Sequence, residues 1–126
     1  MGSKKILIID DEADIREIAK LSLSITKQWD ILTAPSGPEG VEVATNNQLD
    51  AILLDLIMPI TGGLDTLRLL KQNEKTAAIP VVLLTATAKL AMKLEYADLG
   101  IKGILTKPFD PGLLGDQLET VLGWSV

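Results

Sequence analysis

The chain has 126 residues and a formal net charge of −5, and 47% of its residues are hydrophobic although it holds only one Phe, one Tyr and two Trp. This size is typical of one domain with an aliphatic core, and the negative charge argues against a nucleic-acid-binding face. The absence of cysteine and histidine excludes disulfides, thiolate sites and a histidine base or ligand, so any chemistry falls to carboxylates, hydroxyls and lysines. No apolar run reaches the length of a membrane span, so we expect a cytoplasmic protein without membrane contact.

Five short segments have the composition of β-strands. Four of them are continuous apolar runs, too short for helices and too continuous for half-exposed strands, which is typical of parallel strands buried on both faces. The remaining segment, second in the chain, has β-forming residues at lower apolar density, which indicates an outer strand. In chain order the segments are Ile6–Ile9, Trp29–Ala34, Ala51–Leu54, Val81–Leu84 and Gly103–Leu105.

Helical spacing of apolar residues recurs between the strand segments. The residues expected to face the sheet are Ile15, Ile18, Ser22 and Ile25 in the first helix, Val41 and Ala44 in the second, and Leu64, Leu67 and Leu70 or Lys71 in the third. Pro38 and Pro111 follow capping-type residues and predict two helix starts, and Gly100 and Gly123 predict the ends of the last two helices.

The alternation of strands and helices predicts an α/β fold. Five strands and five helices joined by right-handed crossovers give a doubly wound parallel sheet, with helices on both faces and strand order 2-1-3-4-5. Since no linker or repeat interrupts the pattern, we expect residues 1–126 to form one domain with a core at about 4–122.

Polar residues follow the strand segments at their carboxyl ends. They are Asp10, Asp11 and Glu12 after the first strand, Asp55 after the third, Thr85 after the fourth and Lys107 after the fifth. Ligands of such sheets bind at these ends, where the strand order reverses. There Asp10, Asp11 and Asp55 would repel one another by roughly 4 kcal/mol per pair at 4 Å, so a cation is needed. Carboxylate oxygens favour Mg²⁺ or Mn²⁺.

The same arrangement indicates phosphoryl transfer to a carboxylate. Asp55 occupies the middle strand and would attack phosphorus, while the ammonium of Lys107 and the hydroxyl of Thr85 would contact phosphoryl oxygens. Taken singly, each residue has a plainer explanation: Asp10 and Asp11 as helix caps, Asp55 as a turn former and Lys107 as a solvated lysine. Their joint placement at strand ends favours the functional hypothesis.

Four motifs in order resemble those of response regulator receiver domains: Asp10-Asp11-Glu12, Asp55-Leu56-Ile57-Met58-Pro59, Thr85-Ala86 and Lys107-Pro108-Phe109. The resemblance runs from about residue 4 to 122 and implies a flavodoxin-like (βα)5 fold with Asp55 as phosphoacceptor. It implies Asp11, Asp55 and the Ile57 carbonyl as direct Mg²⁺ ligands, with Asp10 acting largely through water. It also implies a cis bond between Lys107 and Pro108, whose energetic cost is small for X-Pro.

The resemblance further implies that Thr85, Ile104 and Pro108 take part in switching and output. Ile104 stands where the family usually has a Tyr or Phe, so an aromatic side-chain relay is not available. A downstream protein target is expected on the face formed by Leu90–Leu99, Ile104 and the last helix.

Three further positions depart from the family pattern or vary within it. Gly62 stands where an acidic residue is common, which loosens the turn. Ile57 and Thr87 occupy the two variable positions that flank the path of attacking water, and we expect them to tune the lifetime of the phosphoryl group.

The expected function is a phosphorylation-dependent signalling switch rather than an enzyme, catalysing only its own phosphoryl transfer and autodephosphorylation. Because the chain has no histidine, we expect a separate sensor histidine kinase or histidine phosphotransfer protein to donate the phosphoryl group. The chain itself is expected to be a monomer or a weak dimer. We expect a stand-alone response regulator that alters protein-protein contacts. The alternatives are a module of a larger regulator or hybrid kinase, and a scaffold that is not phosphorylated. A phosphatase of the haloacid-dehalogenase type would need Asp-x-Asp after the first strand, which Asp10-Asp11-Glu12-Ala13 lacks.

Overall fold

Five parallel strands form one sheet in the computed structural model, which describes residues 4–58, 62–86 and 100–124. The strands are β1 (Lys5–Ile9), β2 (Asp30–Ala34), β3 (Ala51–Asp55), β4 (Val81–Thr85) and β5 (Ile101–Thr106). The helices of the described residues are α1 (Ala13–Thr26), α2 (Gly37–Thr45), α3 (Gly63–Gln72) and α5 (Leu114–Leu122), and none is long and apolar enough to cross a membrane. The strand order β2-β1-β3-β4-β5 confirms the predicted topology. The helix expected to end at Gly100 falls on residues 87–99, outside the described ranges.

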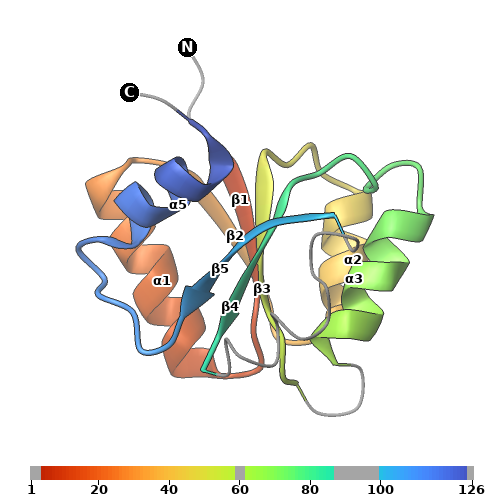
Figure 1. Cartoon of the computed structure of the whole chain (residues 1–126), viewed down its shortest axis with the longest axis horizontal. Helices are drawn as coiled ribbons and strands as arrows, with labels where there is room; N and C mark the ends of the chain where they lie inside the picture. The colour runs from red at the N-terminus through yellow and green to blue at the C-terminus, as the bar shows by residue number, and fades with distance from the viewer. Residues whose placement is uncertain (1–3, 59–61, 87–99, 125–126) are drawn as a thin grey trace.

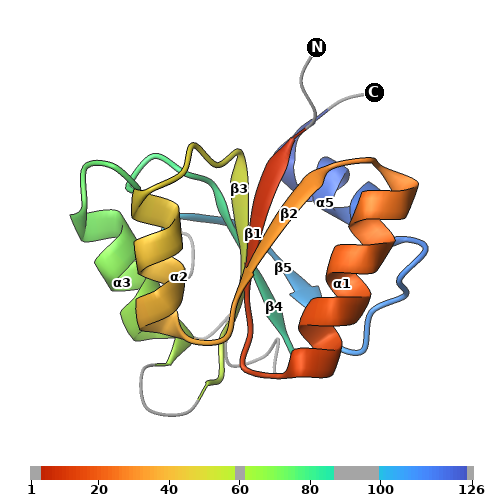
Figure 2. The ribbon, with the colours of Figure 1, turned by 180° about the vertical axis from the view of Figure 1, so that it is seen from behind.

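Helices cover both faces of the sheet, with α1 and α5 on one face and α2 and α3 on the other (Figures 1 and 2). Successive residues of β1 alternate between the two sides: Ile6 and Ile8 pack toward α1 and α5, and Leu7 and Ile9 toward α2 and α3. Every residue of β3 and β4 is buried, whereas the edge strands β2 and β5 have exposed positions. The burial of β1, β3 and β4 is what their continuous apolar runs predicted. The prediction was wrong for the run Gly103–Leu105, because it lies in the edge strand β5, where Gly103 and Ile104 are only partly buried.

The face that α1 turns to the sheet differs from the prediction. Ala19 and Leu23 are fully buried, and Ile15 packs against them as a partly buried residue. Ile18 and Ile25, which we expected to face the core, are 43% and 68% exposed. The prediction was wrong because this helix carries apolar residues on two faces, and periodicity alone does not say which face meets the sheet.

Helices α2 and α3 follow the sequence prediction more closely. The hydroxyl of Ser36 caps α2 by accepting a hydrogen bond from the Glu39 N–H, with Pro38 in the first turn. In α3, Leu67 and Leu70 are buried against the sheet, as their spacing predicted. Both helices therefore lie where local sequence signals put them.

The last helix begins later than expected. We predicted a start at Pro111, but α5 begins at Leu114. Asp110 holds the intervening turn, because its carboxylate accepts the Gly112 N–H at 2.8 Å and its carbonyl accepts the Leu114 N–H at 3.0 Å. The predicted end is confirmed, because Gly123 closes α5 with a φ of 71°.

Candidate functional site

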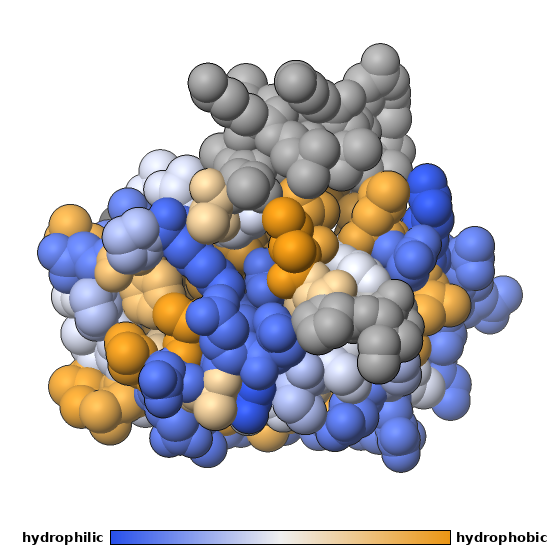
Figure 3. All heavy atoms as spheres, turned by 90° about the horizontal axis from the view of Figure 1, so that it is seen from below, coloured by the Kyte–Doolittle hydropathy of each residue, from blue (hydrophilic) through white to orange (hydrophobic). Residues whose placement is uncertain are grey.

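The sequence-predicted site residues meet at one end of the sheet, where the carboxyl ends of the parallel strands lie. Figure 3 looks onto this end and shows hydrophilic residues gathered near the middle of the face. Asp10, Asp11, Glu12 and Asp55 each offer a carboxylate oxygen that lies within 4.8 Å of the others. A small hollow opens beside them and is lined by Glu12, Asp55, Ile57, Thr85, Ala86 and Lys107. The tertiary structure thus brings the predicted residues together from four strands.

Asp10 directly follows β1 and is 1% exposed. Its Oδ1 accepts a hydrogen bond from the Glu12 N–H at 2.9 Å, and its backbone carbonyl accepts one from Arg16 at 2.8 Å. Its Oδ2 is buried and accepts no hydrogen bond from the described residues, although the Lys107 ammonium lies 2.8 Å away as an ion-pair partner. The neighbouring Asp11 is exposed. One carboxylate is therefore fixed and buried, while the next is exposed to solvent.

Asp55 is the last residue of β3 and is 4% exposed. Its Oδ1 accepts a hydrogen bond from the Ile57 N–H at 3.3 Å. Burial, together with the nearby charge of Asp10, raises the pKa of Asp55 from its ordinary 3.8 to about 6, although Lys107 and the Ile57 N–H act in the opposite direction. The negative charge of Asp55 is thus disfavoured in the absence of a cation.

Lys107 is the cationic centre of the site. Its Nζ lies 2.8 Å from Asp10, 3.0 Å from Glu12 and 3.5 Å from Asp55. Burial lowers the pKa of Lys107, but the contacts with Asp10 and Glu12 outweigh burial and hold the pKa above its ordinary value. The bond to Pro108 is cis, as the resemblance implied. Lys107 therefore stays charged and links β5 to the carboxylates.

Glu12 makes a contact in the site that the sequence did not reveal. It stands at the N-cap of α1, yet its side chain makes no capping hydrogen bond and reaches Lys107 instead. An acidic residue at a helix start is ordinarily explained by capping or by the helix dipole. Nothing local signals the contact, because its partner is 95 residues away in the sequence.

The remaining predicted residues surround this cluster. Thr85 ends β4, is 1% exposed and accepts the Lys107 backbone N–H at its carbonyl at 3.0 Å. Ile57 is 54% exposed at the opening. Ile104 is partly buried in β5 and packs toward α2 and α3. The predicted positions Thr87 and Leu90–Leu99 lie outside the described residues.

The start of α3 holds the end of β3 in place. The Gly63 N–H donates to the Leu56 carbonyl at 2.8 Å. A Cβ on Gly63 would lie 2.6 Å from the Leu56 Cα and would also overlap the Asp55 carbonyl, so only glycine permits this approach. Gly62 has no such restriction, because a Cβ there would meet nothing closer than 3.9 Å.

The donor set fits a hard divalent cation. The clustered groups are carboxylate oxygens, with no histidine or thiolate in the chain, which is the ligand chemistry of Mg²⁺ and Mn²⁺. The Asp10 Oδ2 atom is buried with the Lys107 ammonium 2.8 Å away as its ion-pair partner, and its remaining lone pair can accept a cation or a water bound to the cation. The residues present therefore match the metal that the sequence predicted.

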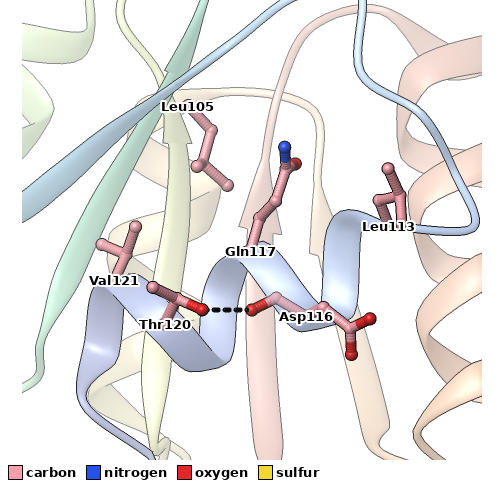
Figure 4. A pocket seen from close by; sticks show the side chains of 6 residues that line it. All are labelled: Leu105, Leu113, Asp116, Gln117, Thr120 and Val121. Carbon is pink, nitrogen blue, oxygen red and sulfur yellow. Dashed lines mark hydrogen bonds between the residues drawn. The ribbon is translucent and has the colours of Figure 1, made fainter.

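A second hollow of about 280 Å³ lies between β5 and α5, and neither Asp55 nor the acidic residues after β1 line it. Figure 4 shows the side chains that line it: Leu105, Leu113, Asp116, Gln117, Thr120 and Val121. The Thr120 hydroxyl donates to the Asp116 carbonyl at 3.0 Å within the helix. This hollow contains none of the predicted phosphoryl-transfer residues.

Comparison with known proteins gives consistent results. Residues 6–119 match the family model of the response regulator receiver domain. The phosphate regulon transcriptional regulatory protein PhoB of Pseudomonas aeruginosa is 37% identical over 122 residues, which are 97% of this chain and 53% of PhoB. The chain thus spans about half of that relative.

Solved structures share the fold over nearly the whole chain. Chemotaxis protein CheY4 of Vibrio cholerae has a TM-score of 0.87 at 28% identity, covering 95% of this chain and 99% of CheY4. The receiver domain of a sensor histidine kinase from Pseudomonas aeruginosa, with magnesium coordinated in its active site cleft, has a TM-score of 0.83 at 24% identity and covers 97% and 99%. The sequence matches and the parallel sheet with its acidic end together show that the chain belongs to the family of response regulator receiver domains.

Proposed function

We propose that this chain is a phosphorylation-dependent switch that accepts a phosphoryl group on Asp55 with the help of Mg²⁺. Receiver domains are signalling modules of two-component response regulators. The observation that carries the proposal for this chain is the position of Asp55, which is buried at the end of β3 with Lys107 3.5 Å away and three further carboxylates close by.

The proposed reaction is a direct transfer between two proteins. A carboxylate oxygen of Asp55 attacks phosphorus of a phosphohistidine on a partner kinase or phosphotransfer protein, because the chain itself has no histidine. The new oxygen-phosphorus bond forms as the nitrogen-phosphorus bond breaks, and the electron pair stays on the imidazole of the donor. Lys107 and Thr85 would hold phosphoryl oxygens by charge and hydrogen bonding. Positioning and charge neutralisation supply most of the rate enhancement in such transfers.

Asp11, Asp55 and the Ile57 carbonyl would hold the metal directly, with Asp10 acting mainly through water. The bound ion would neutralise charge on the transferred group and on the crowded carboxylates. The clustered oxygens support this assignment, and a family member of known structure has magnesium in its active site cleft.

The output of the switch is also a proposal. Because position 104 is Ile and not an aromatic residue, we expect phosphorylation to act through Thr85, Pro108 and backbone shifts that alter contacts with a downstream protein. Leu90–Leu99 lies outside the described residues, so the described part of the expected target face is β5 and α5. The chain matches about half of PhoB, as a module of a longer regulator would, and nearly all of CheY4, as a stand-alone regulator would. Both alternatives are therefore consistent with the comparisons. Its cytoplasmic location and its autodephosphorylation stay predictions.

Incubation with acetyl phosphate and Mg²⁺ followed by intact-protein mass spectrometry tests the proposal. We expect one added phosphoryl group on the wild type and on Asp65→Asn, which removes an exposed carboxylate of α3, and none on Asp55→Asn. An adduct that persists in Asp55→Asn, or a wild type that takes up no phosphoryl group, would contradict it.

A further inference from the structure

Glu12 uses its carboxylate in an unexpected way for a residue at a helix start. Its backbone takes the extended N-cap conformation of α1, with φ −86° and ψ 112°, but its side chain caps no helix amide. Instead its Oε1 accepts a hydrogen bond from Lys107 at 3.0 Å, across 95 residues of sequence. Because an N-cap carboxylate normally gains stability from helix N–H groups, this long-range contact needs another explanation.

The three acids around Lys107 differ in distance and exposure. Asp10 and Glu12 lie 2.8 and 3.0 Å from the ammonium, well within hydrogen-bonding range, whereas Asp55 lies 3.5 Å away, at the outer limit of that range. The ammonium therefore lies closer to the two carboxylates that follow β1 than to the carboxylate of the proposed nucleophile. The side chains of Asp10 and Asp55 are 1% and 5% exposed, but that of Glu12 is 59% exposed.

Glu12 also borders the space that a phosphoryl group would enter. The hollow beside Asp55 is lined by Glu12, Thr85 and Lys107 among others. A phosphoryl group on Asp55 needs a hydrogen bond from Lys107, and each Lys107 N–H that points to Glu12 is lost to that purpose. A bound cation can draw Asp10 and Asp55 to itself, but the proposed metal ligands leave Glu12 as a competing acceptor for Lys107.

We propose that Glu12 is a positioning residue that holds Lys107 away from Asp55 in the unphosphorylated protein and thereby slows phosphoryl uptake. Phosphorylation then requires that Lys107 exchange its hydrogen bond to Glu12 for one to a phosphoryl oxygen. This inference rests on the proposed function of Asp55.

The first test compares phosphorylation rates of Glu12→Gln and Glu17→Gln with the wild type. Glu17 is an exposed acid of the same helix, so its variant controls for the loss of one negative charge. At fixed Mg²⁺, we expect Glu12→Gln to be phosphorylated about three- to fivefold faster than the wild type, which is the rate change that loss of a partly exposed ion pair can produce. Glu17→Gln should be phosphorylated at the wild-type rate. An unchanged or slower Glu12→Gln would overturn the inference.

Reduced repulsion of an anionic donor is a competing cause, so the rates are measured with two donors of different charge. Acetyl phosphate is more negative than phosphoramidate. We expect the same fold increase with both if Glu12 acts through Lys107. A gain seen with acetyl phosphate alone would overturn the inference in favour of simple charge repulsion.

A double-mutant cycle of Glu12→Gln and Lys107→Gln in denaturant tests the contact without any chemistry. Coupling between the two positions should be present in the unliganded protein and disappear with Mg²⁺ and beryllofluoride bound. An absence of coupling in the unliganded protein would overturn the inference. A loss of Mg²⁺ affinity in Glu12→Gln much greater than in Glu17→Gln would also overturn it, because Glu12 would then be a metal ligand. A wild type that takes no phosphoryl group from either donor would instead overturn the proposed function itself.

Discussion

At the residue scale, the surroundings of Asp55 disfavour the negative charge of its carboxylate. Its pKa of about 6 lies above the ordinary value of 3.8, first because it is buried and second because Asp10 is near. The folded protein therefore binds this proton more tightly than the unfolded chain does. The stabilising effect of the proton is complete below about pH 4 and is lost as the pH rises through about 6.

Replacement of Asp55 by Asn should remove this dependence in metal-free buffer. We expect wild-type stability to decline between about pH 4 and 6 relative to Asp55→Asn, and the variant to be more stable at pH 7 by at most about 3 kcal/mol. Urea denaturation with a chelator present, from pH 4 to 7, measures the difference. Asp65→Asn is the control, and parallel curves for wild type and Asp55→Asn would count against a raised pKa.

At the element scale, the connection from β3 to α3 depends on a close approach at one of two adjacent glycines. We expect Gly63→Ala to cost about 1 to 3 kcal/mol, because its Cβ would press on the Leu56 backbone and displace Asp55. Gly62→Ala should be neutral or slightly stabilising, since Gly62 has φ −71° and open space around it. Denaturation together with Mg²⁺ titration compares the two. Equal losses in both variants would mean that the close approach does not position the site.

The orientation of α1 can be checked with two leucines of the same helix. Leu23 is fully buried, so Leu23→Ala should lower the free energy of unfolding by about 2 to 5 kcal/mol. Leu21 is 62% exposed, so Leu21→Ala should change it by no more than about 0.5 kcal/mol. Urea denaturation of both variants decides between the two faces of the helix. The reverse order would mean that the side of α1 bearing Leu21, and not the side bearing Leu23, meets the sheet.

At the scale of the whole molecule, the site lies at one end of the sheet, and Lys4 and Trp124, the first and last residues that the structure describes, lie at the other. At the amino end of β1, Trp124 packs edge-on against Trp29 with ring centroids 5.4 Å apart, and the Lys4 ammonium lies 4.5 Å from the Trp124 ring. Lys27 joins α1 to α5 through Asp116 and Glu119, each at 2.6 Å. The described helices on that face are thus joined by ion pairs that do not involve Asp10, Asp11, Glu12 or Asp55.

Binding of a metal ion at Asp10, Asp11 and Asp55 should raise the free energy of unfolding of the whole domain, because the ion binds the folded state only. Mg²⁺ is expected to raise the melting temperature of the wild type by relieving repulsion at Asp55, and beryllofluoride with Mg²⁺ to raise it further. Differential scanning calorimetry measures both steps. Asp55→Asn should lose most of the first gain and all of the second, and an unchanged wild type with both additives would contradict the metal site.

The sequence by itself determined the strand segments, their parallel order and the residues at their carboxyl ends. These features follow from short stretches of sequence. A run of four apolar residues forms a strand buried on both faces of the sheet, and the residue after that run lies at the carboxyl end of the strand. The meeting of Asp10, Asp55 and Lys107 followed from strand order alone and is confirmed by distances of 2.8 and 3.5 Å from Lys107.

Only the tertiary structure decided the face of α1, the start of α5 and the partner of Glu12. A helix with apolar residues on two sides has no local preference for either, so packing chose Ala19 and Leu23 over Ile18. The delayed start of α5 depends on hydrogen bonds made by both the side chain and the carbonyl of Asp110. Glu12 finds Lys107 across 95 residues, a contact that exists only once β1 and β5 share one sheet.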